Sequence, residues 1–434
     1  MKQARDGYKM TELGEIPVEW ELRELQDVMQ KGGSGVKRGP FGGALKKEFF
    51  VADGFAVYEQ QHVIYNRFNN IRYFITSEKF DELSGFEVLP EDILISCSGT
   101  VGKVSIVPKR IKRGVMNQAL LRFRPEKNLA DHTFLYFLLM SEDVQSRMLD
   151  MTHGSTIKNM VAVSEIKGLK IGLPSLKEQQ KIAEILSTVD EQIENTEQLI
   201  EKTKELKKGL MQQLLTKGIG HTEFKQTKLG EIPVEWEVKA INEVSVFCSN
   251  GFVGTATPFY TEKSDGVLYL QSNNIRKNRL DLTKTVYINS EFTEKYTRAK
   301  VKSNDLLTVQ SGHIGSTAVV TEQFDGVYCH ALIITRLNES IVDPNYLAYY
   351  LNSDIGMKWL SNIFVGSTIK HINVKDFVKF SVPIPNLSEQ QKIASILLSV
   401  DKQIESYEQE KEKYLELKKG LMQQLLTGQI RVTV

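Results

Sequence analysis

The chain of 434 residues contains only three cysteines and no long apolar run. Cys97, Cys248 and Cys329 are far apart and match no CxxC or Cys/His spacing, so neither a disulfide framework nor a zinc site is indicated. The first residues are polar and charged, unlike a secretory signal, and no apolar run is long enough to cross a bilayer. These absences predict a reduced, soluble, cytoplasmic protein that makes no membrane contact.

An excess of charge of one sign is also absent, because 55 Lys and Arg face 54 Asp and Glu. This balance argues against a general polyanion binder. Basic residues without any acid nevertheless gather in residues 28–47 and 93–125. They are Lys31, Lys37, Arg38, Lys46 and Lys47 in the first zone, and Lys103, Lys109, Arg110, Lys112, Arg113, Arg122 and Arg124 in the second. Such zones suit a directed phosphate-binding surface, and the alternative is a hairpin edge protected from aggregation.

Recognisable catalytic motifs are lacking as well. The chain has no GxGxxG, and the segment 99–103 has the wrong spacing for a phosphate-binding loop. The segment 343–346 (DPNY) lacks the second proline of an adenine methyltransferase motif and is expected to cap a helix. The seven histidines have no metal-ligand spacing. The sequence therefore predicts a chain with no catalytic residues, metal or cofactor of its own.

What the chain does have is an internal repeat. The sequence LGEIPVEWE occurs at residues 13–21 and again at 229–237. The 41-residue segments 176–216 and 387–427 are identical at 30 positions, whereas the regions between these landmarks diverge strongly. The spacing is far too long for a solenoid. Two nearly identical frames with different inserts predict one scaffold built twice and one recognition task performed in two ways.

The inserts predict a mixed α/β fold in which strands dominate. Apolar, β-rich runs flank a glycine turn at equivalent places in both copies, and aromatic helical patterns follow them. Strands are predicted within residues 92–107, 119–123, 305–320 and 331–335, and short helices at 132–140 and 345–351.

The repeated 41-residue segments predict two long helices. Pro174 and Pro385 lie just before them, as expected at a helix start. Apolar residues of the first segment step by three and four along a coiled-coil seam, at Ile182, Leu186, Val189, Ile193, Ile200, Leu206, Leu210 and Leu214. A pseudo-two-fold relation would make the pair antiparallel, with Thr196 opposite Tyr407. The predicted fold class is α/β (α+β), with two mixed domains joined by an antiparallel coiled coil.

The polar loops are rich in side chains that can read bases. The segment 58–67 (YEQQHVIYNR) aligns with 269–279 (YLQSNNIRKNR). Gln and Asn can bind adenine through two hydrogen bonds, and Arg can bind guanine in the same way. The alternative is that such loops are only solvated. The same polar character at equivalent places in both copies favours base readout.

The sequence GSTIK occurs at residues 154–158 and 366–370. Its backbone N–H groups, hydroxyls and lysine suit a phosphate clamp. His153 and His371 stand beside these segments and are interpreted as solvated or base-contacting side chains rather than metal ligands. The alternative for GSTIK is a structural turn that leads into the following strand.

The order of these motifs resembles the specificity subunit of type I restriction–modification enzymes, over essentially the whole chain. The motifs are LGEIPVEW, GPFGG at 39–43, SGxxG, NQAL at 117–120, GSTIK, PxxxEQxxIA and LKKGLMQQLLTG. The second copy departs from the first in two of them, with QSGHIGS in place of CSGTVGK and CHAL in place of NQAL.

This resemblance implies a non-catalytic subunit of a site-specific adenine methyltransferase complex in host defence. Each recognition domain is expected to resemble the DNA-reading domain of a γ-type adenine methyltransferase and to read one half-site of double-stranded DNA. The implied partners are two modification (methyltransferase) subunits and the restriction (translocase and nuclease) subunits. S-adenosylmethionine is expected in the modification subunit, and ATP and Mg in the restriction subunit.

The resemblance and the repeat together divide the chain into expected parts. These are a first target recognition domain at 1–174, a spacer helix at 175–216, a linker at 217–226, a second target recognition domain at 227–386, a second spacer helix at 387–428 and a tail at 429–434. The expected DNA-binding residues are Lys37, Arg38, Gln60, Gln61, His62, Asn66, Arg67, Lys103, Asn117, Gln118, Ser155, Thr156 and Lys158 in the first copy, and Gln271, Ser272, Asn273, Asn274, Arg276, Lys277, Arg279, Gln310, His313, His330, Ser367, Thr368, Lys370 and His371 in the second.

The segment LKKGLMQQLL, at 206–215 and 417–426, is a candidate partner surface. A glycine inside a helix costs about 1 kcal/mol relative to alanine, and the apolar face is wider than a seam requires. The candidate partner-binding residues are Gly209, Leu210, Met211, Leu214, Gly420, Leu421, Met422 and Leu425. The alternative is that this face closes the coiled-coil ends or packs on the recognition domains.

Two other functions fit parts of the pattern. A pure assembly scaffold built by duplication would need no base readout, but the basic zones and the paired polar loops argue against it. A fused restriction enzyme would combine methylation and cleavage in one chain. The absence of any methyltransferase or nuclease motif from the sequence argues strongly against that function.

Overall fold

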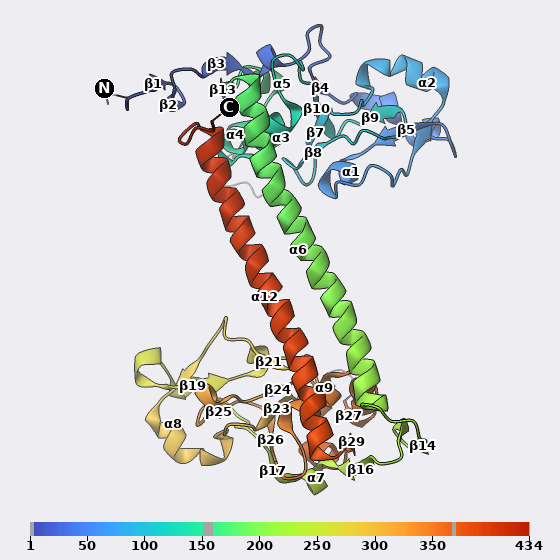
Figure 1. Ribbon diagram of the computed structural model, residues 1–434, viewed down its shortest axis with the longest axis vertical. Coiled ribbons are helices and arrows are strands. Elements are labelled where there is room, and N and C mark those ends of the chain that lie inside the picture. Colours follow the sequence, from blue (N-terminus) through green and yellow to red (C-terminus); the bar gives the residue numbers. More distant parts are fainter. Residues whose placement is uncertain (1–3, 151–158, 367–369, 434) are drawn as a thin grey trace. The chain divides into compact units, whose positions relative to one another are not determined.

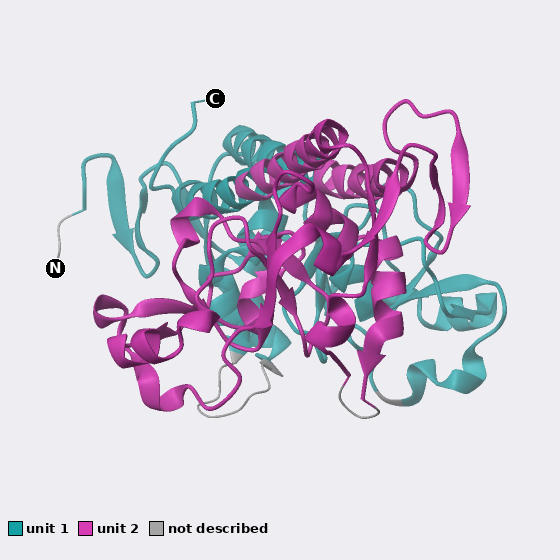
Figure 2. Cartoon of the chain, turned by 90° about the horizontal axis from the view of Figure 1, so that it is seen from below, with its two compact units in different colours: residues 1–196, 410–434 teal, residues 197–409 magenta. Residues whose placement is uncertain are grey.

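The computed structural model describes residues 4–150, 159–366 and 370–433 (Figure 1). The chain forms two compact units, and Figure 2 colours them separately: the first comprises residues 1–196 and 410–434, and the second comprises 197–409. Each unit therefore combines one mixed α/β region with a part of each long helix.

The first unit contains one copy of the repeated fold. Its strands are β1 (Tyr8–Thr11), β2 (Gly14–Pro17), β3 (Glu21–Glu24), β4 (Val36–Arg38), β5 (Phe55–Tyr58), β6 (Phe74–Ile75), β7 (Ile93–Ser96), β8 (Val104–Ile106), β9 (Gly114–Met116), β10 (Leu120–Phe123), β11 (Leu149–Asp150), β12 (Asn159–Met160) and β13 (Lys170–Leu173). Its helices are α1 (Gln60–Ile64), α2 (Ser77–Glu82), α3 (His132–Met140), α4 (Glu142–Met148), α5 (Val163–Lys167), the first part of α6 (Leu176–Lys217) and the last part of α12 (Leu387–Leu426).

The second unit repeats this order with small differences. Its strands are β14 (Phe224–Thr227), β15 (Gly230–Pro233), β16 (Glu237–Ala240), β17 (Ser245–Asn250), β18 (Tyr260–Thr261), β19 (Val267–Leu270), β20 (Ile275–Arg276), β21 (Arg279–Leu280), β22 (Tyr287–Ile288), β23 (Leu306–Val309), β24 (Thr317–Val319), β25 (Tyr328–Cys329), β26 (Leu332–Leu337), β27 (Phe364–Val365), β28 (His371–Ile372) and β29 (Ser381–Ile384). Its helices are α7 (Ile241–Val244), α8 (Ser290–Lys295), α9 (Pro344–Asn352), α10 (Asp354–Leu360), α11 (Val374–Phe377) and the first part of α12 (Leu387–Leu426).

An antiparallel sheet of the same topology lies at the centre of each unit. The strand order is β4–β10–β7–β8 in the first unit and β17–β26–β23–β24 in the second. Leu120 pairs with Ser96, and Leu332 pairs with Val309 in the equivalent register. A second sheet in each unit contains one parallel pair, β5 with β9 and β19 with β25. The divergent inserts therefore share one mixed α/β fold, as the sequence predicts.

The glycine turns expected between the apolar runs are present. β7 and β8 flank a turn in which Gly99 and Gly102 have φ of 63° and 86°. The equivalent turn between β23 and β24 places Gly312 and Gly315 at φ of 87° and 84°. Glycine adopts positive φ without the steric cost of a side chain, so these positions define where each hairpin reverses.

The most repetitive motifs build the framework. Trp20, from the first LGEIPVEW, is 1% exposed and donates its indole N–H to Glu178 at 3.2 Å. Trp236 donates to Glu389 at the same distance. Gln179 and Gln390 follow these two glutamates and are fully buried. Their side chains form hydrogen bonds with the backbone just before helix α3 and helix α9. The repeated motifs thus tie each long helix to its own α/β region.

Both long helices begin where the sequence predicts. The backbone N–H of Glu178 donates to the Ser175 hydroxyl, and that of Glu389 donates to the Asn386 side chain, so each helix has a polar cap. Among the described residues, no helix is both long enough and apolar enough to cross a membrane.

The helix segments pair antiparallel inside each unit. In the first unit Lys418 binds Asp190 at 2.6 Å, and Arg431, just beyond α12, binds Glu178 at 2.7 Å. In the second unit Lys207 binds Asp401 at 2.5 Å and Lys204 binds Glu408 at 3.2 Å. In both units rising numbers along α6 meet falling numbers along α12, which confirms the expected direction of pairing.

The expected seam is wrong at Leu206, whose exposed fraction is 56%. The seven-residue repeat continues through Ile200, Thr203 and Lys207 instead, and Thr203 and Lys207 are half-buried. A lysine can occupy the seam because its alkyl stem packs while its ammonium reaches Asp401. The equivalent Leu417 is likewise 48% exposed, so each unit leaves the first leucine of LKKGLMQQLL on the surface.

A buried ion pair stabilises the main sheet of each unit at the same place. Arg336 binds Asp305 through two hydrogen bonds of 2.8 and 2.7 Å, and the Asp305 side chain is fully buried. Removing the arginine strands a carboxylate in the core. We expect Arg336→Met to lower the free energy of unfolding by about 3–5 kcal/mol, measured by denaturant titration. The control Lys239→Met removes a surface pair with Glu237 and should cost less than about 1 kcal/mol.

Candidate nucleic-acid interface

The segment 58–67, expected to be a polar loop, begins as a helix, and its central side chain is structural. His62 lies in α1, is 1% exposed, and its ring nitrogens contact the Glu59 N–H at 2.8 Å and the Asn70 carbonyl at 3.0 Å. In the second unit Asn274 is 1% exposed and accepts a bond from the Gln271 N–H at 2.9 Å. We therefore remove His62 and Asn274 from the expected base-reading set, because internal partners already occupy their polar atoms.

These two hydrogen bonds, from a backbone N–H to the side chain three residues later, also correct the alignment of the two copies. Glu59 corresponds to Gln271, and His62 corresponds to Asn274, because each pair closes the same backbone hydrogen bond. The expected alignment of Tyr58 with Tyr269 is therefore shifted by one residue. Sequence similarity at the two tyrosines was the misleading signal.

The far end of each loop lies beside the long helix of its own unit. Asn66 lines a hollow with the acidic residues Asp190, Glu191 and Glu194 of α6. Lys277 lines a hollow beside Lys208 and Met211 of α6. Asn66 and Lys277 are both exposed, and their expected role in DNA binding stays a prediction. Arg67 and Arg279 are exposed, and Arg276 pairs with Asp281 at 3.1 Å.

One edge of the main sheet in the first unit gathers several expected residues. Strands β4 and β7 run in the same direction, so Arg38 and the buried Cys97 lie at this edge. β8 and β10 begin there, and they bring Lys103 and the segment 117–119 to the same edge. Lys103 and Gln118 are exposed, whereas Asn117 partly uses its side chain to accept a bond from the Ala119 N–H.

Gln60 lies beside this edge, with its side chain under the glycine turn. A Cβ added at Gly99 would lie 3.6 Å from the Gln60 amide nitrogen. The buried Oε1 of Gln60 has no hydrogen-bond partner among the described residues. Gln61 donates a hydrogen bond to the Glu59 side chain at 3.1 Å, so its amide is less available to bind a base.

The equivalent edge of the second unit carries different side chains. Gln310 follows β23 and donates to the Asn250 side chain at 2.7 Å and to the Ile372 carbonyl at 3.1 Å. His313 is exposed and contacts the Ile275 carbonyl at 2.8 Å. His330 contacts the Tyr269 hydroxyl at 3.0 Å. Burial lowers the pKa of His330, which favours the neutral ring at physiological pH.

The remaining expected residues of the second unit are placed as follows. Gln271 donates to the Tyr260 hydroxyl at 3.0 Å, and Ser272 is half-buried. Asn273 and Lys370 are exposed, and His371 is half-buried in a bridge with Ser311 at the same edge as Gln310. Ser155, Thr156 and Lys158 of the first GSTIK, and Ser367 and Thr368 of the second, lie outside the described residues.

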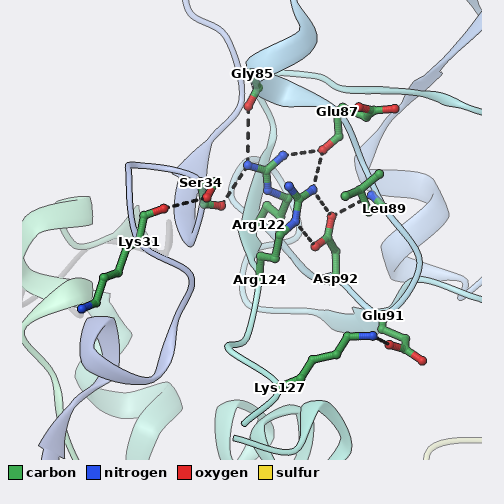
Figure 3. Close-up of polar contacts among 10 residues, drawn as sticks. All are labelled: Lys31, Ser34, Gly85, Glu87, Leu89, Glu91, Asp92, Arg122, Arg124 and Lys127. Atoms are coloured by element: carbon green, nitrogen blue, oxygen red, sulfur yellow. Dashed lines mark hydrogen bonds and ion pairs between the residues drawn. The ribbon is translucent and has the colours of Figure 1, made fainter. Parts of the chain in front are cut away.

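The second basic zone is less basic on the surface than its sequence indicates. Figure 3 shows Arg122 and Arg124 together beside Asp92 and the Glu87 carbonyl. Burial lowers the pKa of Arg122 to about 10, and the side chain is 1% exposed. These two arginines are structural, and the expectation that they join a phosphate-binding surface is corrected.

The other members of the two basic zones divide by whether an acid pairs with them. Lys112 and Arg113 form ion pairs with Asp53 and Glu87 at 2.5 and 2.7 Å. Lys46 binds Glu48 more loosely, at 3.8 Å. Lys37 points its ammonium at the Phe86 ring, 4.4 Å from the centroid. The exposed basic side chains that make no ion pair with any described residue are Lys31, Lys47, Lys103, Lys109 and Arg110.

The sequence analysis missed two residues at the equivalent sheet edges of the two units, Asn250 and Phe41. Asn250 ends β17 at the position where Arg38 ends β4, and both residues are followed by a buried glycine. Phe41 is 70% exposed on the loop after β4 and lies against Arg38, with 5.4 Å between the guanidinium carbon and the ring centroid. The matching offset of 212 residues between Arg38 and Asn250 is the signal that could have identified Asn250.

Comparison with known proteins gives this geometry a context. A family model described as the type I restriction modification DNA specificity domain matches residues 17–205 and 233–416, once for each copy of the repeat. The chain belongs to the type I restriction–modification specificity subunits. It is therefore a non-catalytic, DNA-binding subunit of a type I restriction–modification system, with two target recognition domains.

Individual relatives agree with this assignment. The chain is 28% identical over 366 residues to the type I restriction enzyme MjaVIII specificity subunit of Methanocaldococcus jannaschii, covering 82% of this chain and 83% of the relative. It is 25% identical over 321 residues to the EcoBI specificity subunit of Escherichia coli, covering 71% and 66%.

Two solved structures have the same fold as this specificity subunit. One is the type I restriction–modification system S subunit from M. genitalium, with a TM-score of 0.53, 17% identity and coverage of 95% and 97%. The other is a chain from a study of complex assembly and conformational transition of the type I restriction–modification system. It has a TM-score of 0.58, 15% identity and coverage of 96% and 99%. Among the described residues, no cluster of His, Cys, Asp and Glu is arranged to hold a metal ion.

Proposed function

We propose that this specificity subunit reads a bipartite DNA target, with one half-site for each unit. The observation that carries the proposal is the sheet edge described above, which has the same backbone register in both units but different side chains. Arg38 and Cys97 occupy it in the first unit, and Asn250 and Gln310 occupy it in the second. Conserved geometry with exchanged hydrogen-bonding groups is what two base-reading sites built on one scaffold require.

Phosphate contacts supply the sequence-independent part of this binding. Lys103 is exposed beside the edge, and Lys109 and Arg110 stand on the turn between β8 and β9. Charges of this kind hold DNA in register, and base contacts then select the sequence. The moderate number of unpaired basic residues agrees with a neutral chain that depends on partners for full affinity.

The subunit would recruit two modification subunits through the repeated ends of the long helices. In the first unit a hollow of about 1040 Å³ is lined by Lys418, Lys419 and Met422 of α12 and by the α3–α4 junction. In the second unit a hollow of about 370 Å³ is lined by Lys207, Lys208 and Met211 of α6 and by the α9–α10 junction. Identical helix sequence in both places fits one kind of partner bound twice.

The surface around each hollow agrees with a protein partner. A Cβ added at Gly209 or Gly420 would meet nothing within 4 Å, so another backbone can approach both glycines closely. Leu206 and Leu417 are exposed on the same repeated segments. The proposed contact set contains fewer residues than the sequence predicts. Leu214 and Leu425 are left out because they are buried in the cores of their own units, and Leu210 and Leu421 are half-buried against those cores.

In this proposal the chemistry belongs to the partners. The modification subunits would transfer a methyl group from S-adenosylmethionine to adenine N6, and the restriction subunits would use ATP and Mg. The specificity subunit would position the modification subunits over the adenines of the two half-sites. It would contribute binding energy and orientation only.

Genome-wide methylation mapping tests the proposed function. Cells that contain the subunit and its modification partner should methylate adenine at one motif made of two short half-sites separated by a fixed, unread gap. Cells that lack only the specificity subunit should lose this methylation. A single continuous motif, or the same methylation without the subunit, would contradict bipartite readout. Methylation at unrelated sequences would favour the scaffold alternative.

A further inference from the structure

The last residue of one strand occupies the same place in both units, and its chemistry differs between them. Arg38 ends β4 and pairs with Leu121, and Asn250 ends β17 and pairs with Ile333. The glycine after each strand donates its N–H to the first residue of the neighbouring strand, at 2.9 Å in the first unit and 2.8 Å in the second. The two side chains therefore start from matching backbone positions.

Close packing fixes the root of this strand end in each unit. A Cβ added at Gly39 would lie 1.8 Å from the Asn117 carbonyl oxygen, and one added at Gly251 would lie 2.5 Å from the Cys329 sulfur. No other residue fits at these two positions without displacing the neighbouring backbone or a buried side chain. A rigid root holds the preceding side chain in a constant place, which precise readout of a ligand requires.

In the first unit this side chain is an arginine that has no polar partner in the part of the chain that the structure describes. Arg38 is half-buried, its Nε is buried and unbonded, and it makes no ion pair with any described residue. Its guanidinium lies against the exposed Phe41 ring. Burial raises the pKa of the neighbouring Cys97 to about 11, and the charge of Arg38 opposes this rise. A partly desolvated guanidinium without an acid indicates a missing acceptor.

The buried Oε1 of Gln60, near this edge, is a second polar atom that no described residue binds. Gln60 lies under Gly99, two residues beyond Cys97 in the turn after β7. Polar atoms buried without a partner are costly, so two of them around one turn point to a ligand that offers hydrogen bonds. The edge of a base offers both donors and acceptors.

In the second unit the same place holds two amides. The exposed Asn250 accepts a hydrogen bond from Gln310 at 2.7 Å, and Gln310 is anchored on the Ile372 carbonyl. The Asn250 oxygen keeps one lone pair, and no group among the described residues binds its NH₂ group. An amide held in this way can accept from adenine N6 and donate to adenine N7.

We propose that Arg38 reads a guanine in the first half-site and that Asn250, oriented by Gln310, reads an adenine at the equivalent position of the second half-site. The inference rests on the proposed function and goes further, because it assigns one base to one side chain in each unit. The two units would then differ in specificity at this position through one exchange of side-chain chemistry on an unchanged backbone.

The test measures methylation rates by the complex of this subunit with its modification partner, on duplexes in which each half-site position is varied singly. Arg38→Asn should lower discrimination for guanine at one position of the first half-site by roughly 5- to 150-fold and leave the second half-site unchanged. Arg38→Lys keeps the charge but loses the planar fork, so it should also lose most of this discrimination. Asn250→Arg should shift the preference at one position of the second half-site from adenine to guanine.

Arg72→Asn is the matched control, because Arg72 is exposed, stacks on Tyr73 and makes no hydrogen bond to a described residue. It should change no base preference. The inference is overturned if the wild-type first half-site contains no guanine, if Arg38→Asn weakens all sequences equally, or if Arg38→Lys behaves as wild type. In each of these cases an intact bipartite motif for the wild-type complex would leave the proposed function standing.

Discussion

Replacing residues 227–386 with the same region of another family member should change one half of the methylated motif and leave the other half unchanged. This region lies wholly within the second unit, whereas the first unit keeps its sheet and its helix segments. Methylation of the original second half-site should fall by about 10³-fold or more, the usual gap between specific and non-specific DNA binding. Methylation mapping of the chimaera measures both halves at once.

The design of this chimaera follows from the framework contacts. The donor must supply a tryptophan for Glu389, and it must place a backbone N–H at the position of Asp343, because the Gln390 side chain accepts a hydrogen bond from that N–H at 2.8 Å. The reciprocal exchange of residues 11–174 is the matched experiment. A chimaera in which both half-sites change would refute modular readout, provided that circular dichroism and subunit composition match the wild type.

The repeat made most of the fold predictable. Identical motifs in both copies encode buried contacts, such as Trp20 with Glu178, so their recurrence marks a framework that must be built twice. The two long helices were predictable because proline boundaries and a seven-residue apolar period act locally. Leu206 was assigned wrongly because a strict apolar count cannot see that Lys207 takes its place on the seam by pairing with Asp401.

The candidate site was less predictable, because polar residues are defined by partners far away in the sequence. His62 and Asn274 have base-reading chemistry, but carbonyls several residues away use it internally. The sequence alone indicates that Arg124 is a surface charge, whereas the structure pairs it with Asp92 in the sheet. The sequence around Asn250 does not mark it as a candidate. It becomes one only because it occupies the same strand position in the second unit as Arg38 does in the first. Pairing across strands, rather than composition, separates these cases.

The second large effect is expected at the repeated helix ends. Met211 and Met422 line the proposed docking hollows of the second and first unit. A glutamate at either position would bring an unpaired carboxylate into an interface that excludes water, which costs several kcal/mol. Because about 1.4 kcal/mol corresponds to tenfold in affinity, each change should weaken one partner site on the order of 10³-fold. Native mass spectrometry of the complex should then report one lost modification subunit.

The double variant gives the decisive measurement. Met211→Glu with Met422→Glu should release both modification subunits, while each single variant keeps one, because every unit has its own copy of the surface. Met211→Leu with Met422→Leu conserves apolar volume and should keep both partners. Gln213→Glu adds the same charge at an exposed neighbour that does not line the hollow and should also keep both. If the double glutamate variant folds normally and still holds two partners, the modification subunits must dock elsewhere on the chain.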